Sequence, residues 1–352
     1  MARTIGRLTV AGLACSIALV IAACTNTTNV DATPSGTDTT AHASAPTSRD
    51  GNGVTLGLTY IPNVQFSPVY VAEDEGIYRA AGLNMTVRHH GGDEGLFTAL
   101  MAGEEDMVLA SGDELYQARE QGMDLVSVGT YYQRYPVTIV VPEESPISTV
   151  KDLKGKKVGV PGEYGSSWFG LLAILRNASM SIDDIDVVSI GYTQQAALAG
   201  KQVDAIVAFT NNEPVRFSAA GMKVRTLPVD GDLPLVSASL VTRREWFDEH
   251  QEIACQVVEG TAAGIRRAVE QPQLAIEATQ RRDTGLTEAA QVEGARAVLK
   301  ATTTLFARED GSYGGPQDLA LWEQMADFYQ TIPGLLAQEP DVKAAVTNAC
   351  YE

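Results

Sequence analysis

Residues 152–176 read DLKGKKVGVPGEYGSSWFGLLAILR and contain one complete strand–turn–helix unit. Asp152–Gly155 predicts a turn, and the apolar run Lys157–Val160 predicts a short strand that follows it. Gly165–Ser167 then leads into a strongly apolar helix over Trp168–Arg176. Repetition of such a unit along a chain favours a mostly parallel sheet with crossover helices.

The same alternation extends through the chain from Gly53 to about Arg243, after which the pattern becomes helical to the end. The expected strands are Val54–Thr59, Met85–Arg88, Met107–Ala110, Leu125–Thr130, Val137–Val141, Lys157–Val160, Val187–Ile190, Ala205–Phe209, Val224–Leu227 and Val236–Val241. We therefore predict an α/β fold of two lobes, each a mixed, mostly parallel sheet flanked by helices, with a helical C-terminal region.

The predicted division places the first part of lobe 1 at residues 53–141 and lobe 2 at residues 142–232. Residues 233–352 are expected to return to lobe 1 and to form the C-terminal helices. The hinges between the lobes are expected near 140–143 and 229–234. In such sheets ligands bind beyond the carboxyl ends of the strands, where helix N-termini point into the crevice.

The N-terminus predicts a lipoprotein signal peptide over residues 1–23. Arg3 and Arg7 precede an apolar run, which ends in the small pair Ala22-Ala23 directly before Cys24. A transmembrane anchor is the alternative, but about 15 apolar residues are too few to span a bilayer comfortably. Cys24 would carry the lipid, and residues 24–52, rich in Thr, Ser and Ala, would form a flexible tether. We expect a lipid-anchored protein on the outer face of the cell membrane.

The formal net charge of −18 argues against a nucleic-acid partner, because nucleic acids select basic surfaces. Cys255 and Cys350 remain once Cys15 leaves with the signal, and they either form one disulfide or stay separate thiols. The sequence holds four histidines and has no CxxC, HExxH or Walker motif. We therefore predict no metal site, no cofactor and no catalytic triad.

Several of these segments resemble the type II periplasmic binding proteins of the nitrate, sulfonate and thiamine-pyrimidine group. The similar segments are LTYIPN at 58–63, YVA at 70–72, GIY at 76–78, AGL at 81–83, LMAGEED at 100–106 and DLKGKKV at 152–158. The first is similar to the branch that binds thiamine-pyrimidine precursors. PGEYGSSW at 161–168 and FTNNEP at 209–214 are more similar to the riboflavin-binding branch.

The resemblance implies an ABC-importer substrate-binding protein, monomeric and without catalysis, that passes a heteroaromatic vitamin to a permease and its ATPase. A planar heteroaromatic ligand needs an aromatic clamp and a few directed polar groups. Aromatic and polar residues near the predicted strand ends could supply both, although core packing explains any single one as well. The candidates are Tyr60, Asn63, Asp113, Tyr131, Tyr132, Ser166, Ser167, Trp168, Tyr192, Asn211, Asn212 and Glu213.

Three alternatives stay open from the sequence. Gly165-Ser166-Ser167 before a helix is ready to bind an anion, as an alkanesulfonate or nitrate binder would need. Few cations lie near the expected cleft, Arg134 and Arg216 among them, which favours a neutral ligand. A lipid-anchored sensor module is the second alternative. The third, a pyrimidine-synthesising enzyme of the same fold family, would need a cysteine-rich run that this chain lacks. His89 and His90 are expected to face solvent.

Overall fold

Two five-stranded sheets make up the β-structure of this computed structural model, which describes residues 52–90, 94–336 and 339–352. These residues belong to the unit Pro46–Glu352. The predicted signal peptide, Cys24 and most of the predicted tether lie outside the described residues. No helix in the described part is both long and apolar enough to cross a membrane.

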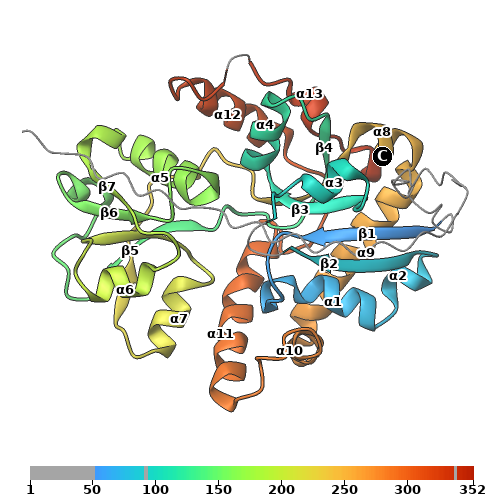
Figure 1. The fold of residues 1–352 in the computed structure, drawn as a ribbon, viewed down its shortest axis with the longest axis horizontal. Coiled ribbons are helices and arrows are strands. Elements are labelled where there is room, and N and C mark those ends of the chain that lie inside the picture. Colours follow the sequence, from blue (N-terminus) through green and yellow to red (C-terminus); the bar gives the residue numbers. More distant parts are fainter. Residues whose placement is uncertain (1–51, 91–93, 337–338) are drawn as a thin grey trace, which may run out of the picture. The chain divides into compact units, whose positions relative to one another are not determined.

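The first sheet has the strand order β2-β1-β3-β10-β4 (Figure 1). β1 pairs in parallel with β2 and β3, and β10 pairs antiparallel with β3 and β4. The bounds are β1 Gly53–Leu58, β2 Asn84–His89, β3 Met107–Ser111, β4 Leu125–Thr130 and β10 Ala238–Arg243.

The second sheet has the order β7-β6-β8-β5-β9. β6 pairs in parallel with β7 and β8, whereas β5 is antiparallel to β8 and β9. The bounds are β5 Val137–Pro142, β6 Lys157–Val160, β7 Asp186–Ser189, β8 Ala205–Phe209 and β9 Val224–Thr226. The predicted α/β class with two mixed sheets is confirmed.

Helices cover both faces of each sheet. They are α1 Ser67–Asp74, α2 Ile77–Ala80, α3 Thr98–Ala102, α4 Gly112–Glu120, α5 Gly165–Asn177, α6 Gln194–Ala199, α7 Glu213–Ala219, α8 Arg244–Glu249, α9 Gln251–Glu270, α10 Pro272–Gln280, α11 Ala289–Phe306, α12 Leu319–Gln330 and α13 Val342–Ala345. Short 3-10 turns lie at Val64–Phe66, Val150–Leu153, Ile182–Asp184 and Ala349–Tyr351. Local chemistry explains several starts: Ser111 and Glu114 form a capping box at α4, for example.

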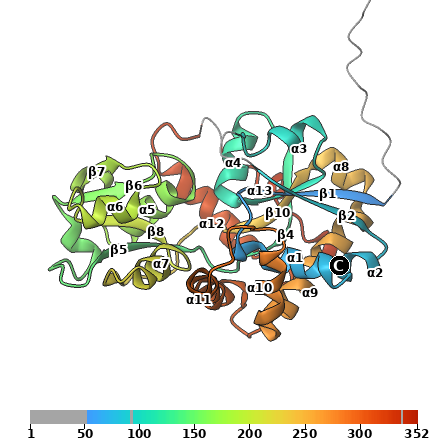
Figure 2. The ribbon, with the colours of Figure 1, turned by 60° about the horizontal axis from the view of Figure 1, so that its bottom comes forward.

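The cores follow the two-residue period of the strands. Val137 and Ile139 of β5 are buried in a cluster with α5 residues, whereas Val140 is buried on the opposite face with residues of α6 and α7. In the first sheet, β1 residues such as Leu56 pack with α1 and α9, and Val108 of β3 packs with α4 and α12. Figure 2 shows α1, α9 and α10 grouped on one side of the first sheet.

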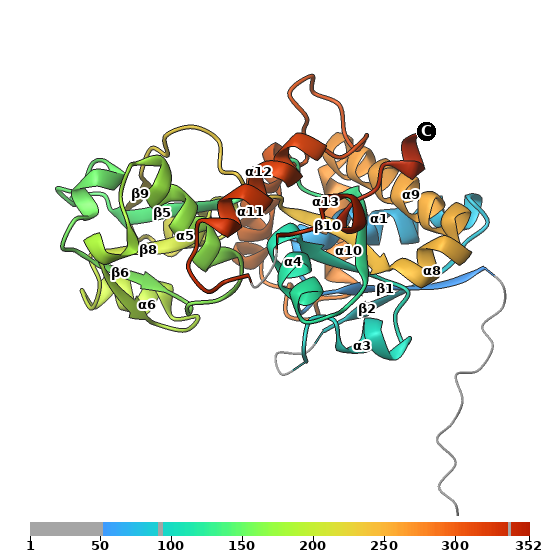
Figure 3. The same ribbon diagram turned by 90° about the horizontal axis from the view of Figure 1, so that it is seen from above.

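The chain passes between the sheets twice, through residues 131–136 and residues 227–237. The boundary expected at residue 142 falls at the end of β5, whereas the chain has already left the first sheet after Thr130. Both Leu125–Thr130 and Val137–Pro142 are buried apolar strands, and their pattern does not tell which sheet each joins. The C-terminal region also reaches α5, as the ribbon of α12 beside α5 shows (Figure 3). Phe169 of α5 and Tyr329 of α12 have ring centroids 5.0 Å apart.

Cys255 of α9 and Cys350 near the C-terminus form a disulfide, with their Cα atoms 4.9 Å apart. The bridge spans 95 residues of sequence, so it closes a long loop between α9 and the chain end. Closing a loop of this size restricts the unfolded chain and thereby stabilises the fold.

Helix α9 packs closely against α1 and α2, and it carries a glycine at each of the two contacts. A Cβ atom at Gly264 would collide with the carbonyl oxygen of Pro68, and one at Gly260 would meet the ring of Tyr78. Gly264 therefore lets the backbone of α9 pack against that of α1, and Gly260 leaves room for the Tyr78 ring of α2.

We predict that Gly264→Ala lowers the free energy of unfolding by about 1–3 kcal/mol, because the new methyl group forces two helices apart. Gly294→Ala in α11 is the matched control, since nothing lies within 4 Å of the added carbon. That control should be neutral or stabilise by up to about 1 kcal/mol. Urea unfolding of both variants tests the pair, and equal midpoints would contradict it.

Candidate functional site

A cavity of about 430 Å³ lies where loops and strand ends of the two sheets meet. Its volume is within the range of pockets that bury small molecules. Its walls come from the segments that follow β1, β3, β4, β6, β7 and β8. Lining residues used below are Tyr60, Gln65, Phe66, Ser111, Glu114, Tyr131, Tyr132, Tyr164, Ser166, Ser167, Tyr192, Gln194, Asn211, Asn212, Glu213 and Arg216.

Three tyrosines on this cavity present large exposed rings. Tyr60 follows β1 and is 54% exposed, while Tyr164 and Tyr192 follow β6 and β7 and are 57% and 78% exposed. Tyr164 and Tyr192 line the same cavity, and burial together with the phenol of Tyr164 raises the pKa of Tyr192. Aromatic rings therefore reach the cavity from both sheets, the arrangement needed to hold a planar ligand between faces.

A deeper aromatic group supports this wall. The rings of Tyr131 and Tyr132 lie 5.1 Å apart, and each packs against Phe306 of α11. Tyr131 is buried, and its hydroxyl donates to the carbonyl oxygen of Gln65 over 2.8 Å. Burial raises the pKa of both tyrosines, so they are neutral phenols at physiological pH.

Asn211 provides a directed polar group at the cavity wall. It is 1% exposed, and its Nδ2 donates to Thr302 Oγ1 of α11 over 3.0 Å. Its Oδ1 has no hydrogen-bond partner among the described residues. A buried carbonyl oxygen without a donor costs free energy, so a ligand N–H that reached this atom would gain a hydrogen bond.

Glu213 is held by its own loop. Its carboxylate accepts from the backbone N–H of Phe209 over 2.7 Å and from Asn212 Nδ2 over 3.1 Å. Burial raises its pKa, although these hydrogen bonds and Arg216 oppose the rise. Glu114 also lines the cavity, while Arg216 is the cationic side chain of the lining. Two carboxyl groups against one guanidinium disfavour an anionic ligand.

The N-termini of α4 and α5 meet beside the cavity. Ser166 of α5 donates its Oγ–H toward Asp113 Oδ2 over 3.1 Å and lies 3.2 Å from Ser111 Oγ. Tyr135 Oη donates to the carbonyl oxygen of Ser166 over 3.0 Å. Asp113 is fully buried, so this contact joins the first sheet to the second through a carboxyl group removed from water.

Comparison with known proteins identifies the family of this chain. Residues 63–275, more than half of it, match the family described as NMT1/THI5 like. The chain belongs to the NMT1/THI5-like family. It is 31% identical over 350 residues to riboflavin-binding protein RibY of Chloroflexus aurantiacus, covering 97% of each chain. It is also 25% identical over 162 residues to 4-amino-5-hydroxymethyl-2-methylpyrimidine phosphate synthase of Legionella pneumophila, covering 46% of this chain and 51% of the other.

The fold matches a solved structure of the periplasmic aliphatic sulphonate binding protein SsuA from Escherichia coli. The TM-score is 0.68 at 20% identity, and the match covers 84% of this chain and 97% of the other. The predicted periplasmic-binding-protein type II fold is therefore confirmed. The NMT1/THI5-like family thus includes binding proteins and, among more distant relatives, enzymes.

In this NMT1/THI5-like chain, the structure brings nine of the twelve sequence-predicted site residues to the cavity and places Asn63, Asp113 and Trp168 elsewhere. Asn63 caps the turn Val64–Phe66 by accepting from Gln65 N–H. Asp113 points at Ser166, as described above. Trp168 is partly buried against the helix and strand cores on either side of α5. Trp168 misses the cavity because of its position around α5, which directs Ser166 and Ser167 to the cavity instead.

Sequence reasoning missed Tyr164, Phe66 and Glu114, all of which line the cavity. Tyr164 lies inside the selected segment 161–168, Glu114 follows the selected Asp113, and Phe66 lies three residues after the selected Asn63. The sequence thus pointed to these loops but not to the individual side chains. The expectation that His89 and His90 face solvent is wrong for His90, and His89 is only partly exposed. His90 is 4% exposed, and its Nε2 lies 2.9 Å from Glu105 Oε1, a buried acid that periodicity alone does not reveal.

No group of three or more His, Cys, Asp and Glu residues able to hold a metal ion occurs in the ranges that the structure describes. The cavity offers aromatic faces, an unpartnered carbonyl oxygen and carboxyl groups instead. Such a site can bind and orient a small planar molecule.

Burial of Asp113, with the neighbouring Glu114 carboxylate, raises the pKa of Asp113 from its ordinary 3.8 to about 7. The folded state then keeps a proton that the unfolded state loses above about pH 4, so stability should fall as the pH rises from about 4 to 7. Asp113→Asn removes this dependence.

We expect the melting temperature of the wild type to drop by several degrees relative to Asp113→Asn across this pH range. The exposed Asp327→Asn on α12 serves as the control and should track the wild type. A constant difference between the wild type and Asp113→Asn at all pH values would contradict a buried protonated Asp113.

Proposed function

We propose that this protein is the substrate-binding component of an ABC importer and that it captures riboflavin in the cavity between its two sheets. The observation that carries the proposal is the aromatic lining supplied by both sheets around the unpartnered Asn211 Oδ1. The full-length similarity to a riboflavin-binding protein supports the same ligand. A thiamine-pyrimidine precursor is the second candidate, because it shares the planar ring and the N–H donors.

In the proposed complex, Tyr60 contacts one face of the flavin ring while Tyr164 and Tyr192 contact it from the second sheet. The imide N–H of the ring donates to Asn211 Oδ1. A ligand that touches both sheets favours the closed arrangement, because its binding free energy differs between open and closed states. Ser167, Asn212 and Glu213 would bind the polar side chain of the ligand.

A sulfonate or nitrate ligand fits the lining less well. Ser166, which the anion hypothesis needs, already donates to Asp113, and the cavity holds the carboxyl groups of Glu114 and Glu213. A negative ligand would be placed against these acids. We therefore propose a neutral vitamin rather than an anion, with no catalysis.

The remaining parts of the proposal concern the location of the protein. A signal peptide over residues 1–23 and a lipid on Cys24 would hold the domain on the outer face of the cell membrane, next to its permease. Replacement of Cys24 by Ser should release the protein from the membrane fraction, as an immunoblot of cell fractions would show. Unchanged membrane association would contradict the lipid anchor.

Fluorescence titration of the full-length chain in detergent tests the ligand. We expect saturable quenching of riboflavin, weaker binding of flavin mononucleotide because of its phosphate, and no competition by an aliphatic sulfonate. Binding of a hydroxymethyl-pyrimidine without binding of riboflavin would move the assignment to the second candidate. Binding of the sulfonate alone would contradict the neutral-ligand proposal.

Tyr60→Ala should weaken riboflavin binding about tenfold or more, since stacking on an aromatic ring contributes roughly 1–3 kcal/mol per ring. Ile61→Ala is the matched control. Ile61 is adjacent and 53% exposed, and it is absent from the cavity lining. The control should bind like the wild type, and equal losses in both variants would contradict a specific contact by Tyr60.

The role of Asn211 is tested with a flavin methylated at its imide nitrogen. The wild type should bind this analogue about tenfold more weakly than riboflavin, because the methyl group removes the donor that Oδ1 accepts. Asn211→Leu should bind both flavins equally weakly. Discrimination between the two flavins that survives in Asn211→Leu would place the imide elsewhere.

A further inference from the structure

The loop between β1 and the turn Val64–Phe66 carries Tyr60 into the cavity, yet it belongs to no helix or strand. We infer that His89, oriented by Tyr70, is a positioning residue that fixes this loop and thereby sets ligand affinity without touching the ligand. This inference rests on the proposed contact between Tyr60 and the ligand. His89 is the last residue of β2 and does not line the cavity.

Hydrogen bonds join the loop to His89 at both ends. Asn63 N–H donates to Tyr70 Oη over 3.3 Å, Tyr70 Oη lies 3.1 Å from His89 Nε2, and His89 Nδ1 lies 2.9 Å from the carbonyl oxygen of Tyr60. Residues 61 and 62 are thus enclosed between two anchored backbone groups, and the position of the Tyr60 backbone depends on one imidazole ring.

Donor and acceptor rules fix the direction of this chain. A backbone carbonyl oxygen can only accept, so the Nδ1 of His89 must carry the proton and donate to Tyr60. In a neutral imidazole Nε2 then accepts, and the Tyr70 hydroxyl is its donor. The same hydroxyl accepts from Asn63 with a lone pair. Burial, opposed by the hydrogen bond to Tyr60 and aided by Arg282, lowers the pKa of His89, which is consistent with the neutral ring.

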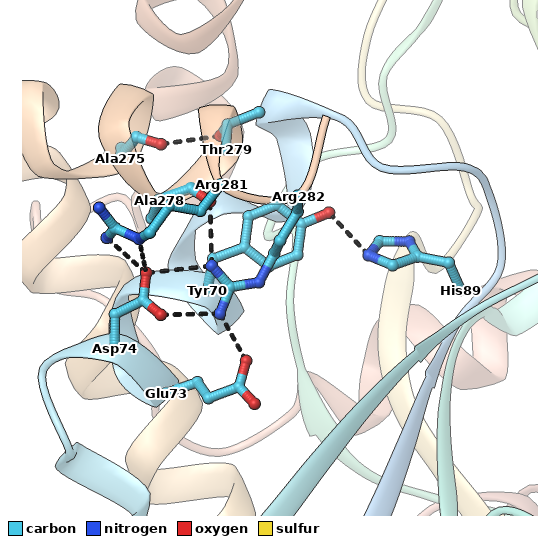
Figure 4. Close-up of polar contacts among 9 residues, drawn as sticks. All are labelled: Tyr70, Glu73, Asp74, His89, Ala275, Ala278, Thr279, Arg281 and Arg282. Atoms are coloured by element: carbon cyan, nitrogen blue, oxygen red, sulfur yellow. Dashed lines mark hydrogen bonds and ion pairs between the residues drawn. The ribbon is translucent and has the colours of Figure 1, made fainter. Parts of the chain in front are cut away.

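Tyr70 is itself held rigidly. It is fully buried, and the guanidinium carbon of Arg282 lies 4.6 Å from its ring centroid (Figure 4). Arg282 in turn pairs with Glu73 Oε2 over 2.5 Å and with Asp74 Oδ1 over 2.9 Å. Figure 4 shows these acids and the arginine on one side of the Tyr70 ring, with His89 at its hydroxyl. The C-terminal end of α1 and the residue Arg282 just after α10 therefore brace the donor to His89.

His89 also contacts a second side chain of the cavity wall. Its ring meets that of Phe66 edge to face, with centroids 5.9 Å apart. Phe66 lines the cavity beside Tyr60. One residue outside the cavity thus contacts the backbone of one of its aromatic residues, Tyr60, and the ring of another, Phe66.

The test measures the riboflavin dissociation constant of full-length variants by fluorescence quenching. His89→Leu removes both hydrogen bonds and should weaken binding about tenfold. His89→Asn should recover most of this loss, because its amide nitrogen lies near the place of Nδ1 and can donate to Tyr60. His250→Leu is the matched control, since His250 also lies 3.1 Å from a backbone carbonyl oxygen and stacks on Trp246. It should bind like the wild type.

His89→Leu made in a Tyr60→Ala background separates the positioning role of His89 from the ligand contact of Tyr60. If His89 acts through Tyr60, His89→Leu should cause little further loss once Tyr60 is absent. Circular dichroism and a melting curve identify any variant that fails to fold, and His89→Asn then carries the comparison. Unchanged affinity in His89→Leu, or losses that multiply in the double variant, would overturn the inference. A lack of effect of Tyr60→Ala alone would instead overturn the proposed ligand contact.

Discussion

A hydrogen bond from Ser166 of α5 to Asp113 of α4 joins the N-termini of two helices that follow strands of different sheets. Each helix starts directly after or close to a strand of its own sheet, so this contact also brings the strand ends together. The cavity forms beside it, with walls drawn from both sheets. Asp113 is buried, so the hydrogen bond that it accepts from the Ser166 hydroxyl satisfies a carboxyl group that water does not reach.

The side chains that do not take part in the Ser166–Asp113 contact decide which ligands the cavity can bind. Ser166 is engaged, and the lining carboxyl groups of Glu114 and Glu213 occupy the place where an anion binder would need cations. Aromatic rings and Asn211 Oδ1 remain for the ligand. The NMT1/THI5-like family includes proteins with different names and activities, so the lining residues, more than the fold, carry the assignment of a ligand.

Much of the fold could be predicted because strand and helix periodicities are local. Every predicted strand has a counterpart, and the class of two mixed sheets was correct. The predicted boundary between the lobes, at residue 142, lies one strand too late, since Leu125–Thr130 and Val137–Pro142 are equally apolar.

The loops of the site were also predictable, because ligand sites follow strand ends. Individual side chains were less so: Trp168 and Ser166 differ by two helical positions, and only the packing of α5 decides which one reaches the cavity. The partnership of His89 with Tyr70 and Tyr60 depends on three segments that meet only in the folded chain.

A crystal structure of the protein with riboflavin would test the central claim most directly. We predict that the flavin ring lies inside the cavity, with Tyr60 on one side, Tyr164 or Tyr192 on the other, and the imide nitrogen within hydrogen-bond distance of Asn211 Oδ1. A flavin bound outside this cavity, or one held there only by polar contacts at the N-terminus of α5, would contradict it.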